Sequence, residues 1–168
     1  SPEATVNYNN GVKISIKYSQ PSKKGREIFG KLVPFGVVWR TGANEATEIE
    51  FYQNVKISTT KIKKGRYTMY CIPYADKWTI ILNKETDTWG SFKYDTKKDV
   101  VRMDVPVQKQ TEITESFAMA FEKAATGEGC DPSAIDHGTI FRSDEPDAAA
   151  RVQLDEPAAE QHRERDGE

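Results

Sequence analysis

Histidine is absent from residues 1–123, and the two histidines of this 168-residue chain, His137 and His162, both lie after that point. A domain without histidine cannot use Ser-His-Asp or Cys-His catalysis. It also cannot bind zinc or iron through imidazole ligands. We interpret the two late histidines as incidental, and we predict neither a metal site nor a cofactor.

Cysteine and long apolar runs are also scarce. The chain has two cysteines, Cys71 and Cys130. Cys71 alternates with Met69 and Tyr67, so we expect a small buried apolar residue rather than a nucleophile. A disulfide between Cys71 and Cys130 is compatible with the sequence but not implied by it. No apolar run approaches the length of a membrane-spanning helix, so no transmembrane segment is predicted.

Lysine disappears after Lys123, and the charge changes sign there. Residues 1–123 carry 20 Lys and Arg against 14 Asp and Glu, whereas residues 124–168 carry 4 against 12. The net charge of −2 therefore combines a positive part and a negative part. The positive charges are spread over many segments instead of gathering on one helix or ribbon, so we predict no nucleic-acid binding.

Alternating apolar and polar residues are the main pattern that is present. They predict short strands over residues 12–18, 45–51, 55–57, 66–72, 77–83, 101–107 and 113–121. Residues 27–32 fit either one helical turn or a short strand. No long helical period competes, so the predicted fold class is all-β, either an antiparallel β-sandwich or an open barrel of short strands.

Residues 38–47, with the sequence VWRTGANEAT, bring an aromatic ring, a cation, two turn formers and a carboxylate together. Glu45 shares the parity of the apolar residues in the following strand, so a strand beginning there would point its carboxylate at the core. A buried carboxylate needs a partner, and Arg40 is the nearest one. The pair is either part of a polar pocket with Asn44 or an ion pair that fixes the loop. The second is favoured because structural ion pairs outnumber functional ones.

Aromatic residues offer a second route to binding. A ligand cleft for a sugar or another flat molecule could be built from Trp39, Trp78, Trp89, Tyr70, Tyr74 and Tyr94. The alternative, which we favour, is that Trp39 and Trp78 fill the core. Trp89 lies beside Gly90 in a polar loop and is expected at the surface. The candidate binding residues are Trp39, Arg40, Asn44, Glu45 and Trp89.

Longer motifs resemble one bacterial envelope family, domain-of-unknown-function family 2911, over about residues 4–131. They are YSQPSKKGR at 18–26, IFG at 28–30, LVP at 32–34, VWRTGANEAT at 38–47, GRY at 65–67, IP at 72–73, WTII at 78–81 and WG at 89–90. The resemblance implies a β-rich domain that is periplasmic or secreted. For a chain that begins at Ser1, we expect that a signal peptide has been removed or that the chain was cloned from this point. The resemblance supplies no activity.

The sequence loses this character after about Asp131. Residues 132–168 are rich in alanine and acidic residues, and Phe141 is their one aromatic residue. Such a stretch buries little apolar surface. We therefore predict a β domain over 1–131 and a low-order tail over 132–168, irregular or partly helical. We interpret the tail as a shifted reading frame or a fused sequence, with a frayed helix expected over 152–163.

Three functions remain open. The first is a non-enzymatic envelope module that binds a small molecule, a glycan or a partner protein through residues 38–45 and Trp89. The second is an enzyme in which Glu45 acts as acid or base and Arg40 as an electrostatic clamp. The third is a purely structural domain. The lack of histidine and of a nucleophile motif favours the first and the third, and neither the ligand nor the oligomeric state follows from the sequence.

Overall fold

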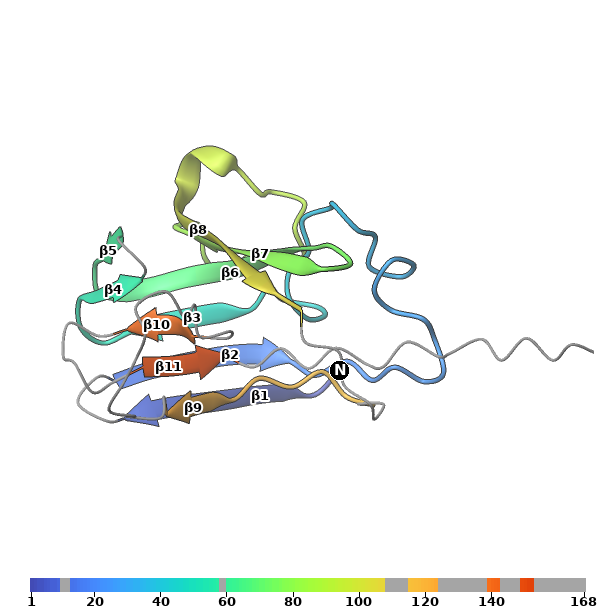
Figure 1. The fold of residues 1–168 in the computed structure, drawn as a ribbon, viewed down its shortest axis with the longest axis horizontal. Coiled ribbons are helices and arrows are strands. Elements are labelled where there is room, and N and C mark those ends of the chain that lie inside the picture. Colours follow the sequence, from blue (N-terminus) through green and yellow to red (C-terminus); the bar gives the residue numbers. More distant parts are fainter. Residues whose placement is uncertain (10–12, 58–59, 108–114, 124–138, 143–148, 153–168) are drawn as a thin grey trace, which may run out of the picture.

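A computed structural model describes residues 1–9, 13–57, 60–107, 115–123, 139–142 and 149–152 of the chain. Its main sheet is antiparallel and six-stranded, in the order β1-β2-β3-β6-β7-β8 (Figure 1). These strands are β1 (Glu3–Asn9), β2 (Lys13–Ser19), β3 (Glu48–Phe51), β6 (Gly65–Pro73), β7 (Lys77–Asn83) and β8 (Asp99–Pro106). The predicted all-β, antiparallel fold class is confirmed.

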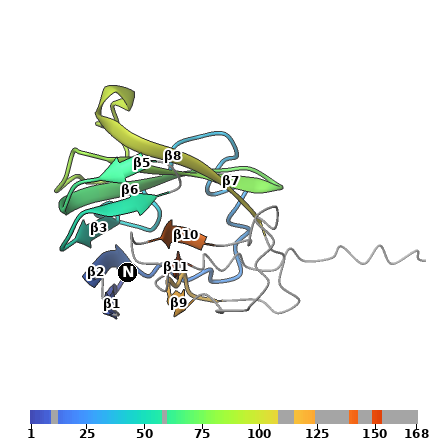
Figure 2. The ribbon, with the colours of Figure 1, turned by 60° about the vertical axis from the view of Figure 1, so that its left-hand side comes forward.

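A second sheet has the order β5-β4-β10-β11-β9. Its strands are β4 (Val55–Ile57), β5 (Thr60–Ile62), β9 (Phe121–Lys123), β10 (Thr139–Arg142) and β11 (Ala149–Val152). Figure 2 shows β9, β10 and β11 as a layer beside the main sheet. The single helical turn in the described residues is the 3-10 helix η1 (Thr96–Lys98). No helix there is long and apolar enough to cross a membrane.

Side-chain alternation explains how β2 and β3 pack in the main sheet. In β2, Ile14, Ile16 and Tyr18 are buried, as the sequence predicts. Ile16 lies opposite Ile49 of β3, and Ile14 lies opposite Phe51, so the apolar residues of both strands share one face. This face and the apolar residues of β4 and β5 belong to the same core cluster.

The central hairpin of β6 and β7 is buried on both faces. Met69 and Cys71 belong to the main core, whereas Tyr70 and Ile81 form a second cluster on the opposite face with Ala46. Val38 packs against this second cluster. The connection between β2 and β3 therefore covers the outer face of the hairpin, and this contact fixes the position of residues 38–47.

The structure differs from the predicted elements at several places. β3 begins at Glu48 instead of Glu45, and residues 27–32 contain turns and an isolated bridge at Phe29 instead of a helix or a strand. Of the described residues in the strand predicted over 113–121, only Phe121 belongs to a strand, β9, and residues 113–114 lie outside the described part of the chain. β1, β10 and β11 were not predicted, and β10 and β11 come from the expected tail. The frayed helix expected over 152–163 falls outside the described residues except for Val152, which ends β11.

Candidate ligand-binding cavity

The long connection between β2 and β3 forms one end of the molecule (Figure 1). Two sets of backbone hydrogen bonds anchor it. Phe117 N donates to Pro21 O at 2.9 Å, and Lys23 N donates to Glu115 O at 2.7 Å. Trp39 and Cys71 exchange hydrogen bonds at 2.7 and 2.9 Å, which attaches the connection to the edge of β6. The loop is therefore held at both of its sides.

A cavity of about 390 Å³, the end cavity, lies between this connection and residues 115–117. Its walls come from Pro21, Ser22, Lys23, Arg26, Ile28, Phe29, Leu32, Val33, Trp39, Arg40, Gly42, Ala43, Glu115, Ser116 and Phe117, together with Ser1. Small-molecule sites occupy about 300–1,000 Å³ and are mostly apolar with a few polar groups. The end cavity has the size and composition of such a site.

Aromatic rings build the apolar wall of the cavity. Trp39 meets Phe29 at a centroid distance of 5.5 Å and Phe117 at 5.4 Å, both edge to face. Behind it, Trp39 contacts the buried Trp78 at 5.9 Å. The indole Nε1 of Trp39 donates to Gly42 O at 3.1 Å, which satisfies its polar atom. This wall is preformed, because its rings are fixed by the core and by each other.

Arg40 is among the residues that line the cavity. Its side chain is half-buried, and its Nε is shut off from solvent without a hydrogen-bond acceptor. A Cβ at Gly90 would lie 3.6 Å from Arg40 Nη1, so the guanidinium rests against the loop that follows β7. No described residue pairs with the Arg40 side chain in an ion pair or accepts from it.

Positive charge exceeds negative charge around the cavity. Lys23, Arg26 and Arg40 line it, whereas Glu115 is the one carboxylate among its lining residues. Glu115 Oε1 already accepts a hydrogen bond from Lys24 N at 2.8 Å. Arg26 donates to the carbonyl oxygens of Lys23 and Ser22 at 3.0 and 2.9 Å. The lining therefore favours a negatively charged occupant.

The turn after Arg40 depends on unusual backbone angles. Thr41 and Asn44 both have φ of +58°, and a Cβ at Gly42 would meet Ser19 O at 3.1 Å. Thr47 Oγ1 donates to Thr41 O at 2.6 Å and holds the turn closed. Left-handed residues are uncommon outside glycine, so the turn is strongly determined by its surroundings.

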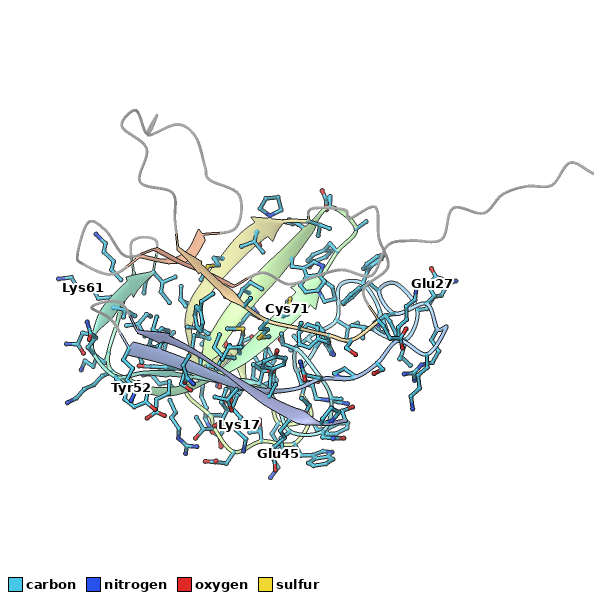
Figure 3. All side chains as sticks on the ribbon, turned by 90° about the horizontal axis from the view of Figure 1, so that it is seen from below. Lys17, Glu27, Glu45, Tyr52, Lys61 and Cys71 are labelled. Atoms are coloured by element: carbon cyan, nitrogen blue, oxygen red, sulfur yellow. The ribbon has the colours of Figure 1, made fainter. Side chains whose placement is uncertain are left out.

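The predicted Arg40–Glu45 ion pair is wrong. Glu45 is exposed, and it lies at the edge of the molecule (Figure 3). The parity argument fails because Ala46 and Thr47 are both buried, so alternation breaks before β3 begins. Ala46 N donates to Thr88 O, and Gly90 N donates to Asn44 O, which leaves Glu45 directly opposite Trp89.

The five predicted binding residues therefore divide into two groups. Trp39 and Arg40 line the end cavity. Glu45 and Trp89 lie side by side on the outer surface, with Asn44 bonding to the same loop through its carbonyl oxygen. Trp89 is 61 % exposed, as we predicted, and Trp78 is a core residue. Sequence reasoning missed Phe29 and Phe117 as wall residues, although Phe29 belongs to one of the quoted family motifs.

A second depression, the polar groove, lies beside Glu45 and has a volume of about 130 Å³. Arg66 donates to Glu48 at 3.1 Å and to Asp87 at 2.9 Å, and Asp87 N donates back to Glu48 at 2.7 Å. The hydrogen bond from Arg66 lowers the pKa of Asp87 and raises the pKa of Arg66. These three residues satisfy one another, so we interpret them as a structural network.

Neither a thiol nor a metal site is available for chemistry in the described residues. Cys71 is free and fully buried, and burial raises the pKa of its thiol well above the ordinary value. A buried neutral thiol is a poor nucleophile, which confirms the prediction of a small apolar residue. No group of three or more His, Cys, Asp or Glu side chains there is arranged to hold a metal ion.

Comparison with known proteins identifies a family without an assigned activity. A family model described as a protein of unknown function, DUF2911, matches residues 1–130 of the chain. No curated protein and no solved structure matches the chain.

Proposed function

We propose that this chain, which belongs to the DUF2911 family of proteins of unknown function, is a non-enzymatic binding module whose small-molecule ligand occupies the end cavity. The observation that carries the proposal is the cavity itself, about 390 Å³ behind a preformed aromatic wall. A cavity filled by side chains would indicate a structural domain instead. An open, apolar and preformed cavity lowers the cost of binding, because little has to be ordered on association.

Binding is favoured over catalysis by the separation of the groups that a reaction would need. The enzyme hypothesis required Arg40 and Glu45 to act together, but Glu45 lines the polar groove and not the end cavity. Glu115 is the one carboxylate among the described residues of the cavity wall, and it is engaged by a backbone N–H. A general acid or base has to reach its substrate within hydrogen-bond distance, and Glu45 is not among the described residues that line the end cavity.

A cavity-filling substitution tests the proposal. Ala43 lines the cavity, so Ala43→Leu should fill part of it and weaken the binding of naphthyl or decyl compounds, measured by isothermal titration calorimetry. Ala75→Leu is the matched control, because Ala75 is exposed in the turn between β6 and β7. Equal affinities in the two variants would show that these compounds bind elsewhere, and the proposal would fail.

The location of the protein in the envelope is part of the same proposal. The motifs that resemble the bacterial envelope family support a periplasmic or secreted domain. The test is fractionation of cells that express the full-length gene, followed by immunoblotting of the cytoplasmic, periplasmic and secreted fractions. Recovery in the cytoplasm alone would contradict the location without affecting the cavity.

A further inference from the structure

We infer that the ligand of the end cavity is an amphipathic anion, with an apolar body against Trp39 and Phe29 and a single carboxylate or similar oxyanion bound by Arg40. The inference rests on the proposed function, because it assigns a chemical class to the ligand of the same cavity. It is carried by the lack of a hydrogen-bond acceptor for the Arg40 side chain among the described residues, the charges of the cavity lining and the aromatic wall.

Arg40 differs from every other arginine whose side chain the structure describes. Arg26 donates to two backbone carbonyl oxygens. Arg66 donates to Glu48 and Asp87, and Arg102 donates to Asp99 and to the hydroxyl of Tyr94. Arg40 alone among the four has no acceptor, although it is half-buried. A guanidinium in that position is normally compensated, so a compensating group from outside the chain is expected.

The buried Nε of Arg40 lacks a hydrogen-bond acceptor. A donor that neither water nor protein satisfies destabilises the position of its side chain. Turning the guanidinium toward an oxyanion in the cavity would provide acceptors for Nε and for one Nη together. Carboxylates are well suited to this, because their two oxygens match the planar fork of arginine. The hydrogen bonding of Arg40 is therefore something that binding of an oxyanion can improve.

The rest of the lining selects against neutral and cationic ligands. Lys23 and Arg26 add two positive charges, whereas Glu115 is held by Lys24 N and contributes one negative charge. An anion gains from this excess, and the gain is larger next to apolar walls than in open water. A cation would meet repulsion, and a neutral ligand would leave Arg40 unpaired.

Two pairs of compounds isolate the charge from the apolar body. Naphthylacetate is compared with naphthylethanol, and decanoate with decanol, because each pair shares a body and differs in the anion. Calorimetry on the full chain should show that the anion of at least one pair binds about tenfold more tightly than its alcohol. Arg40→Met should reduce the affinity for that anion to the level of the alcohol and leave the affinity for the alcohol unchanged. Arg40→Lys should fall between the two, because it keeps the charge and loses the fork.

Lys61→Met is the matched control for net charge. Lys61 lies on β5, at the opposite end of the molecule from Glu27 and the loop that builds the cavity (Figure 3). It should leave both affinities unchanged. Arg40→Gln serves as a second variant, and thermal unfolding of each variant verifies that it is folded.

The outcomes separate the two proposals. Equal affinity of the wild-type protein for anion and alcohol in both pairs overturns the anion inference and leaves the binding function standing. A loss of anion affinity that is the same in Arg40→Met and Lys61→Met also overturns it, because the effect is then one of overall charge. Failure of all four compounds to bind below about 1 mM overturns the proposed function itself.

Discussion

The end cavity and the polar groove each have an arginine among their lining residues, but the two arginines differ in their hydrogen-bond partners. In the polar groove, Arg66 is held by two carboxylates that are themselves hydrogen-bonded. In the end cavity, Arg40 has no acceptor among the described residues, and its Nε is buried. A network that satisfies all its members needs no ligand, whereas an incomplete one leaves a position for a ligand to fill.

The two regions are joined by one short piece of chain. Residues 41–47 run from Arg40 of the cavity to Glu48 of the groove, and their turn separates the two side chains. The turn depends on the Thr47–Thr41 hydrogen bond and on the aromatic ring of Trp39, which donates to Gly42 O. Substitutions in the wall, in the turn and in each region can therefore separate structural roles from binding roles.

The largest effect is expected at the aromatic wall. Trp39→Ala should lower the free energy of unfolding by about 3 kcal/mol, because it removes a ring that contacts Phe29, Phe117 and Trp78. Trp89→Ala is the matched control, since Trp89 is 61 % exposed, and should change stability by less than about 0.5 kcal/mol. Urea denaturation measures both. A larger loss for Trp89→Ala would mean that the outer loop, and not the wall, organises this end of the molecule.

The turn between the regions should be the next most sensitive position. Thr47→Val keeps the shape of the buried side chain and removes the donor to Thr41 O, which should cost about 1–2 kcal/mol. Thr5→Val on the exposed face of β1 is the control, and it should be neutral within about 0.5 kcal/mol. Comparison of their urea midpoints tests this. An unaffected Thr47→Val would indicate that backbone contacts alone hold the turn.

The contrast between the two arginine sites is tested by one substitution in each. Glu48→Gln weakens the charged network and should lower the free energy of unfolding by about 1 kcal/mol, with ligand affinity unchanged. Arg40→Met should have the reverse pattern, with stability within about 0.5 kcal/mol of wild type and anion affinity lost. Denaturation and calorimetry on both proteins supply the four values. A marked loss of stability in Arg40→Met would make Arg40 structural and remove the contrast.

Sequence patterns predicted β2 and β7 well. The bounds predicted for β7 match the structure, and β2 has its buried residues where the alternation places them. Alternation failed at Glu45 because two adjacent residues, Ala46 and Thr47, are buried before β3 begins. A period of two residues cannot be extended backward through a turn whose angles are left-handed.

The candidate site was only partly predictable for a related reason. Arg40 stood out as an isolated cation, but its partner was sought nearby in sequence, where the positive φ of Thr41 and Asn44 sends the chain to another surface. The wall residues Phe29 and Phe117 are 88 positions apart in the chain and meet through Trp39. The pairing of residues 21–24 with residues 115–117 brings these segments together, and no local pattern encodes that pairing.

The smallest expected effect is the pH dependence of the polar groove. Hydrogen bonding to Arg66 lowers the pKa of Asp87 in the folded protein. A carboxylate with a lowered folded pKa contributes stability above its unfolded pKa, about 3.9, and loses it as the pH falls through the folded value. The difference in melting temperature between wild type and Asp87→Asn should therefore be present at pH 6 and should shrink below about pH 4.

A second carboxylate allows this assignment to be verified. Hydrogen bonds from Thr79 and Lys77 lower the pKa of Asp104 on the exposed face of β7 and β8. Protonation of both Asp87 and Asp104 therefore lowers the stability of the wild-type protein in acid. Asp87→Asn should remove one part of the acid dependence and Asp104→Asn the other, and both parts should weaken in high salt because the groups are exposed. A difference between wild type and Asp87→Asn that stays constant from pH 6 to about pH 2 would show that Arg66 does not hold Asp87 as a charged partner. The groove would then be as incomplete as the cavity, and the contrast between the two arginines would no longer identify Arg40 as the binding residue.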